Sequence, residues 1–187
     1  VFTLASGTAG ASPMLVTIGG LASAPANLTG CTGVACGEQV LSAAYLHLVN
    51  SPVTENTATS GAGIGVDAPN SPATTISNCL IDANSAYGPG GGVVVETGSA
   101  VSIQKSTITG NSAGNGGGVY GWSGSALTIA GATISGNAAH AIATHFGLSG
   151  GGGGGIEAMG AISLDSSYLI NNVADGEDGG GGLALYP

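Results

Sequence analysis

The sequence predicts an all-β fold, a right-handed parallel β-helix (a β-solenoid), on three observations. A motif of about 27 residues occurs five times, apolar residues stand two positions apart within it, and a glycine-rich step leads into a further apolar run. Apolar residues two apart indicate strands with one buried face, and a fixed period of this length is typical of solenoids. We expect about five regular three-strand coils, and right-handedness follows from the general preference of parallel crossovers.

Five asparagines anchor the repeat at intervals of 28, 27, 26 and 35 residues: Asn56, Asn84, Asn111, Asn137 and Asn172. Three positions before them stand Val53, Ile81, Ile108, Ile134 and Leu169, and five positions before them Ser51, Cys79, Ser106, Ala132 and Ser167. Asn tolerates a left-handed backbone at a corner, and stacked Asn side chains can hydrogen-bond along a column. We therefore predict a structural Asn ladder beside a thin, dry core.

The strands of each coil follow from the same alignment. Eight positions before the Asn residues stand Leu48, Ile76, Ile103, Ile129 and Leu164, which mark a first strand. Glycine-rich links after them lead into the apolar runs 64–66, 93–95, 119–120, 156–158 and 183–185. Since each coil adds about 4.8 Å along the axis, equivalent strands are expected to stack directly above one another.

Two segments depart from the repeat. Residues 1–45 fit it poorly, and we expect an irregular N-terminal coil or cap-like section there, with 16–18 and 39–41 as candidate strands. The regular β-helix is expected over residues 46–187. Between Asn137 and Ile156 lie 18 residues instead of the seven between Asn111 and Val119, so residues 138–155 predict a glycine-rich side loop.

The composition excludes some partners. The 187 residues include one basic residue, Lys105, and ten acidic ones, for a formal net charge of −9. Nucleic acid is not an expected partner, because phosphate binding needs clustered cations. Membrane insertion is not expected either, because no stretch reaches the roughly 18 apolar residues of a spanning helix. A hydrophobic content of 43% with only 6% charged residues instead indicates a folded chain.

The pairing of a turn such as Thr107-Ile108-Thr109-Gly110-Asn111 with a step such as Gly117-Gly118-Val119 resembles the right-handed β-helix repeats of secreted surface proteins. The resemblance is to polymorphic outer-membrane proteins and autotransporter adhesins, and it covers residues 46–185. It implies an extracellular or cell-surface protein with a structural or adhesive role. We expect a segment of a larger surface or filament-forming protein, since the chain starts without Met and stops directly after a strand-like run.

No catalytic centre is predicted. The outward rows two and seven positions before the Asn residues do not stack acids, and Lys105 is the one candidate cation. A polysaccharide-processing β-helix enzyme, which needs acids converging on one exterior face, remains an alternative. A carbohydrate-binding module is another, for which the repeats offer Tyr87, Tyr120, Trp122 and Tyr168.

The remaining candidates concern single sites. Asp175, Glu177 and Asp178 are a calcium candidate on a glycine-rich link, although a solvated acidic turn explains them as well. His140 and His145 are interpreted as plain loop residues. Cys31 and Cys36 are spaced for a disulfide that closes a short loop, and Cys79 is expected to be buried. Asn27 begins an N-glycosylation sequon.

One outward row and the two ends bear on partners. Nine positions before the Asn residues stand His47, Thr75, Ser102, Thr128 and Ser163. The β propensity of these residues explains the row. Its hydroxyls could alternatively carry O-linked glycans or pack laterally against another molecule. Because neither end carries a polar cap, we expect other domains of the same polypeptide or neighbouring subunits to cover the ends of the solenoid.

Overall fold

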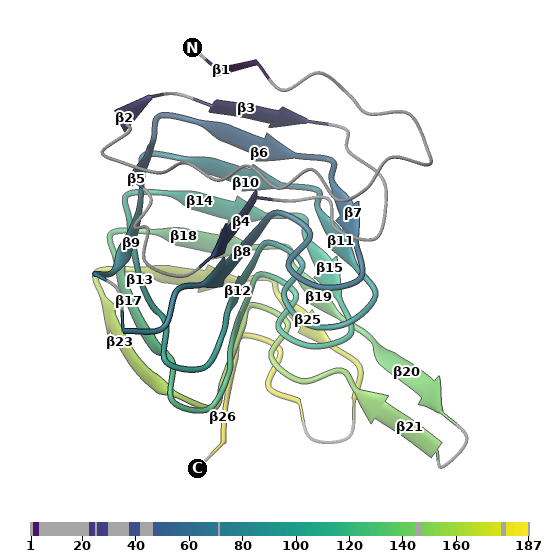
Figure 1. The fold of residues 1–187 in the computed structure, drawn as a ribbon. Coiled ribbons are helices and arrows are strands. Elements are labelled where there is room, and N and C mark those ends of the chain that lie inside the picture. Colours follow the sequence, from purple (N-terminus) through teal and green to yellow (C-terminus); the bar gives the residue numbers. More distant parts are fainter. Residues whose placement is uncertain are drawn as a thin grey trace.

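The computed structural model describes residues 2–3, 23–24, 26–29, 38–41, 47–70, 72–144, 147–176 and 179–186. All regular elements in these ranges are β-strands, and strands of successive coils lie parallel on top of one another (Figure 1). Four parallel sheets run along the resulting column. The parallel β-helix that the sequence predicts is thereby confirmed, with one more sheet than the three strands per coil suggest.

We number the sheets in the order in which a coil passes through them. The first sheet contains β2 (Ser23–Ala24), β5 (His47–Val49), β9 (Thr74–Ser77), β13 (Ala100–Gln104), β17 (Ala126–Ala130) and β23 (Ala161–Asp165). The second contains β1 (Phe2–Thr3), β3 (Ala26–Thr29), β6 (Pro52–Thr54), β10 (Leu80–Asp82), β14 (Thr107–Thr109), β18 (Thr133–Ser135) and β24 (Tyr168–Ile170).

The other two sheets follow the asparagine of each coil. The third contains β7 (Thr57–Ala58), β11 (Ser85–Ala86), β15 (Ser112–Ala113), β19 (Ala138–Ala139) and β25 (Val173–Ala174). The fourth contains β4 (Glu38–Leu41), β8 (Ile64–Asp67), β12 (Val93–Val95), β16 (Val119–Gly121), β22 (Ile156–Ala158) and β26 (Leu183–Leu185). The third sheet has strands of only two residues, too short to produce a visible alternation of apolar and polar residues.

The core is a vertical stack of branched side chains. In the second sheet Ile81 pairs with Ile108, and Ile108 pairs with Ile134. All three are fully buried and belong to one cluster with inward residues of the first and fourth sheets, including Ile103 and Val93. Full burial of such a side chain contributes about 1.5–3 kcal/mol. The predicted alignment of these three isoleucines on one column is confirmed.

Each coil turns through left-handed residues, but not through the ladder asparagines. Positive φ angles occur one residue earlier, at Glu55, Ala83, Gly110, Gly136 and Asn171. A second left-handed corner precedes the small inward row, at Asn50, Asn78, Lys105, Gly131 and Ser166. The prediction of a left-handed Asn was wrong, because the preceding residue makes the turn and thereby directs the Asn side chain into the column.

The two irregular segments are partly incorporated into the solenoid. Strands β2, β3 and β4 pair with β5, β6 and β8, so residues 23–41 contribute strands to three of the four sheets. The candidate strand at 39–41 coincides with β4, whereas 16–18 lies outside the described residues. Within 138–155, β20 (Ala141–Thr144) pairs antiparallel with β21 (Gly147–Gly150). The extra residues therefore form a hairpin beside the column (Figure 1).

The last coil carries apolar side chains that no following coil covers. Leu164 and Leu185 are 38% and 58% exposed. Their partners one coil earlier, Ile129 and Ala158, are buried. Among the described residues, no helix has the length and apolar character needed to cross a membrane.

Candidate functional site

The five ladder asparagines hydrogen-bond to one another along the column. Nδ2 of Asn84 donates to Oδ1 of Asn111 at 2.9 Å, and the same 2.9 Å bond joins Asn56 to Asn84, Asn111 to Asn137 and Asn137 to Asn172. The backbone N–H of Asn84 donates to Oδ1 of Asn111 as well, at 3.0 Å. Each of these Oδ1 atoms therefore accepts two bonds from the preceding coil.

The second amide hydrogen also has a partner. Nδ2 of Asn111 donates to the carbonyl of Ile81 at 3.0 Å, and Nδ2 of Asn137 donates to that of Ile108 at 2.9 Å. Buried polar groups that have all their hydrogen bonds rigidify a core, whereas partly satisfied ones are costly. The ladder is thus a structural site that fixes the spacing and register of the coils.

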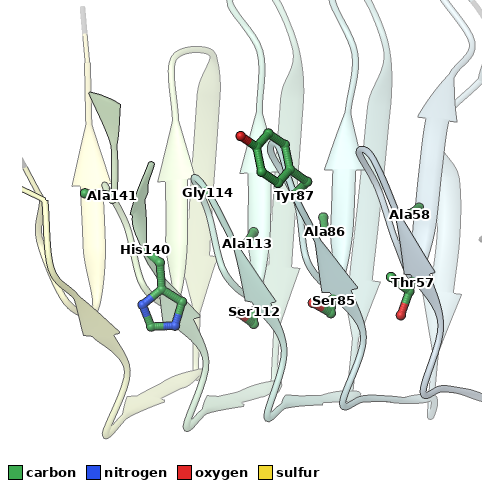
Figure 2. Close-up of a pocket in the computed structure, with 10 residues that line it drawn as sticks. All are labelled: Thr57, Ala58, Ser85, Ala86, Tyr87, Ser112, Ala113, Gly114, His140 and Ala141. Atoms are coloured by element: carbon green, nitrogen blue, oxygen red, sulfur yellow. The ribbon is translucent and has the colours of Figure 1, made fainter. Parts of the chain in front are cut away.

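A shallow groove lies over the outer face of the third sheet. Its volume is about 370 Å³, and it is lined by Thr57, Ala58, Ser85, Ala86, Tyr87, Ser112, Ala113, Gly114, His140 and Ala141. Figure 2 shows the hydroxyl side chains of Thr57, Ser85 and Ser112 in one row across successive coils. The pairing of Ser85 with both Thr57 and Ser112 sets this row, so the hydroxyls recur at about 4.8 Å, the interstrand spacing.

Two larger side chains border the groove. The ring of Tyr87 is at one border, and the ring of His140 stands at the end next to Ala141, where the hairpin leaves the column (Figure 2). Tyr87 is 70% exposed. The groove therefore combines an exposed aromatic face with a row of hydrogen-bonding hydroxyl groups.

His140 is held by Asp175 of the next coil. Nδ1 of His140 lies 3.0 Å from Oδ2 of Asp175, and the N–H of Ala141 donates to Oδ1 at 2.6 Å. The hydrogen bond from His140, followed by the one from Ala141, lowers the pKa of Asp175 below its usual value. The carboxylate thereby fixes the start of the hairpin on the end of the groove.

The calcium candidate is only partly described. Asp175 is engaged by His140 and Ala141, while Glu177 and Asp178 lie outside the described residues. The described part of the chain contains no group of three or more His, Cys, Asp or Glu residues arranged to hold a metal ion. Calcium binding at this link therefore stays a prediction.

Acidic and aromatic side chains gather on the outer face of the fourth sheet. Tyr120 of β16 is paired with Glu157 of β22, and its ring packs edge-on against Trp122 with centroids 5.1 Å apart and an interplanar angle of 76°. Tyr120 and Glu157 are almost completely buried. Within the described residues, the buried atom Oε2 of Glu157 has no hydrogen-bond partner.

Burial perturbs the ionisation of these groups. It raises the pKa of Glu157 to about 7, against a smaller opposing effect of the Gly116 N–H. Burial, together with the nearby Glu157 and Glu96 carboxyls, raises the pKa of Tyr120 to about 12. Glu96 also has a raised pKa through burial and the charge of Asp67, while the Trp122 indole favours its ionised form. At neutral pH a large fraction of Glu157 is therefore uncharged.

The structure places the other predicted residues as follows. Cys79 is buried, and its Sγ lies 3.2 Å from the Ser77 carbonyl, which confirms the expected burial. The outward row from His47 to Ser163 stacks in register along the first sheet. Asn27 lies in β3, whereas Cys31, Cys36 and His145 lie outside the described residues. Glycosylation and the disulfide remain predictions.

The fold and the ladder define a parallel β-solenoid. The chain matches the right handed beta helix region family over residues 28–139, which is more than half of its length. It belongs to this family, and the predicted right-handed β-helix is confirmed. No curated protein and no solved structure matched the chain.

Sequence reasoning missed the groove and the acidic cluster for different reasons. The groove depends on the two-residue strands of the third sheet, whose signal was a single alanine two positions after each Asn. Glu157 stands in a row of the fourth sheet where the other coils carry Gln39, Gly65, Val94, Tyr120 and Ala184. Aligning this row would have singled out Glu157 as its one acidic residue among the described coils.

Proposed function

We propose that the chain is a non-catalytic, extracellular β-helix with a structural or adhesive role, and that it is a segment of a larger cell-surface or filament-forming protein. The observation that carries the proposal is the unbroken hydrogen-bonded ladder from Asn56 to Asn172. A column of coils in fixed register is a rigid spacer, and a spacer displays neighbouring domains at a constant distance. The resemblance of the repeats to those of polymorphic outer-membrane proteins and autotransporter adhesins supports the same role.

The groove over the third sheet supports an adhesive contribution. Its row of hydroxyls and the exposed Tyr87 ring suit a glycan chain lying along the column. Hydroxyl rungs about 4.8 Å apart are close to the length of one sugar unit, and an aromatic ring provides a stacking surface for a sugar face. Glycans on another cell or matrix are therefore the proposed surface partner.

The last coil supports contacts at the end of the column. Leu164 and Leu185 form exposed apolar positions directly below the buried residues Ile129 and Ala158. Such side chains, together with the unpaired edges of β23 and β24, favour coverage by a further domain or a neighbouring subunit. This is the contact expected of a segment within a longer rod or filament.

Two other functions compete with this proposal. A polysaccharide-processing enzyme needs two accessible carboxyls on one face; Glu96 is half-buried and Glu157 is buried, which favours a structural role for this pair. A dedicated carbohydrate-binding module is favoured by the groove alone. Release of reducing ends from neutral or acidic glycans by the purified chain would support the enzyme and contradict our proposal.

A binding experiment separates adhesion from a purely structural role. The purified chain is applied to an array of neutral and acidic glycans, beside Tyr87→Ala and the control Tyr168→Ala, which removes an equally exposed tyrosine from the last coil. We expect binding to drop about tenfold or more for Tyr87→Ala and to be unchanged for the control. Equal binding by all three proteins would exclude the groove. Immunogold labelling of intact and of permeabilised source cells tests surface location, and labelling only after permeabilisation would contradict it.

A further inference from the structure

Glu157 is enclosed by the segment that returns from the hairpin to the column. Its side chain leaves β22, a central strand of the fourth sheet that pairs with both β16 and β26. An added Cβ at Gly152 would lie 2.9 Å from both Oε2 of Glu157 and the hydroxyl oxygen of Tyr186. Gly152 therefore lies directly against the carboxyl of Glu157, which is only 3% exposed.

The covering segment does not continue as a β-strand after Gly150, and single hydrogen bonds join it to the neighbouring coils. Gly151 donates to the Gly114 carbonyl at 2.6 Å, Gly116 donates to the Gly152 carbonyl at 3.0 Å, and Gly176 donates to the Gly151 carbonyl at 3.2 Å. By contrast, β22 is bonded on both sides along its length. Any strain at Glu157 is therefore relieved more easily by residues 150–152 and the attached hairpin than by the sheet.

The surroundings of Glu157 tolerate a neutral carboxyl and oppose a charged one. Tyr120 faces it from β16, and Tyr186 follows β26 beside Gly152. Lys105 lies at the corner between β13 and β14, in other sheets. Within the described residues, the group that favours its charge is the Gly116 N–H, whose carbonyl partner Gly152 belongs to the covering segment. A buried charge without a counterion or full hydrogen bonding is strongly unfavourable.

We propose that Glu157 is a proton-controlled latch: its neutral carboxyl keeps residues 150–152 closed over the fourth sheet, and its ionised carboxylate releases this segment with the β20–β21 hairpin. Asp175 anchors the other end of the hairpin through Ala141 and His140. Release of the hairpin would also alter one end of the groove over the third sheet, because His140 and Ala141 line that end. It does not depend on the proposed adhesive function.

Hydrogen exchange measured by mass spectrometry tests the latch on the whole chain. Protection of amides 141–144 and 147–152, corrected for intrinsic exchange, is compared at pH 5.5 and pH 8.5. We expect protection in the wild type to fall about tenfold or more at the higher pH. Glu157→Gln is expected to reduce this pH dependence by at least half, because the amide stays neutral. Asp165→Asn removes an exposed acid of the first sheet and is the control that keeps the wild-type response.

The results of these variants distinguish an effect of Glu157 from an effect of His140. His140→Gln is expected to keep most of the pH response, because the covered carboxyl dominates it. The proposal is overturned by equal protection of the wild type at both pH values, or by an undiminished response in Glu157→Gln. If Glu157→Gln fails to fold by circular dichroism, Glu157→Met provides an apolar side chain of similar length for the same comparison.

Discussion

Oδ1 of Asn137 accepts two hydrogen bonds from Asn111, one from Nδ2 at 2.9 Å and one from the backbone N–H at 3.0 Å. One side chain therefore fixes both the position and the backbone of the residue one coil above. This relationship repeats down the ladder, so Asn84, Asn111 and Asn137 each donate to one ladder neighbour and accept from another. Loss of a single member leaves unsatisfied groups in two coils.

Replacing Asn111 with Ala is expected to destabilise the chain by about 2–4 kcal/mol. The change removes the acceptor of Asn84 Nδ2 and of the Asn84 N–H, and each buried group without a partner costs about 1–3 kcal/mol. Urea unfolding followed by circular dichroism measures the free energy. The control is Gln104→Ala, an exposed carboxamide whose Nε2 bonds only within its own strand, to Ser102. Equal loss in both variants would contradict a special role of the ladder.

The glycine step before the fourth sheet is expected to reject even a methyl group. An added Cβ at Gly92 would lie 2.5 Å from the Gly118 carbonyl of the next coil. Gly92→Ala should therefore destabilise by about 1–3 kcal/mol, as overpacked cores do. Gly182 holds the same position in the last coil, where an added Cβ would be 3.8 Å from Leu169. Gly182→Ala should be nearly neutral in the same unfolding experiment, and a comparable loss would refute the steric explanation.

Most of the column could be predicted from the sequence because the same type of side chain is required at the same position of every coil. Ile81, Ile108 and Ile134 must fill a narrow interior, and their alignment identifies the coil before any local propensity is considered. The left-handed corners were misplaced by one residue, since Ala83 and Gly110 do not share a side-chain type that marks the turn. The hairpin was predicted as a loop, because glycine-rich segments carry no alternation of apolar and polar residues.

The site was less predictable than the fold. The ladder followed from a repeated Asn, but the groove requires the spatial arrangement of Tyr87 and His140, which belong to different coils. The enclosure of Glu157 depends on Gly152, which lies against its carboxyl. Gly152 reaches this position because the chain returns to the column there after the hairpin. Repeats therefore predict what recurs in every coil, whereas a feature of one coil has to be found in the structure.

Glu157 should make the stability of the chain decrease from acid to neutral pH. Its pKa is raised from 4.5 to about 7, so between these values the folded state binds more protons than the unfolded state. Stability from this group is therefore fully present near pH 4, falls as the pH rises to about 7 and is constant above it, with a total change of about 1–3 kcal/mol. Urea midpoints at pH 4.5 and pH 8 measure this difference.

Glu157→Gln tests the assignment of that pH dependence. The neutral amide should be more stable than the wild type at pH 8 and should lose most of the difference between the two pH values. Asp165→Asn, an exposed acid of the first sheet, is the control and should behave as the wild type. An unchanged pH profile in Glu157→Gln would assign the effect to other groups.

The row that contains Cys79 should accept hydroxyls but not larger side chains. Ser51, Ser106 and Ala132 hold the equivalent positions, and the N–H of Cys79 donates to Oγ of Ser106 at 3.1 Å. Cys79→Ser should change the free energy of unfolding by less than about 1 kcal/mol, since a hydroxyl there can donate to the Ser77 carbonyl as Ser106 does to Gln104. Cys79→Leu should cost about 1–3 kcal/mol through overpacking. Unfolding curves that rank the two variants in the opposite order would show that the size of this side chain does not limit the corner.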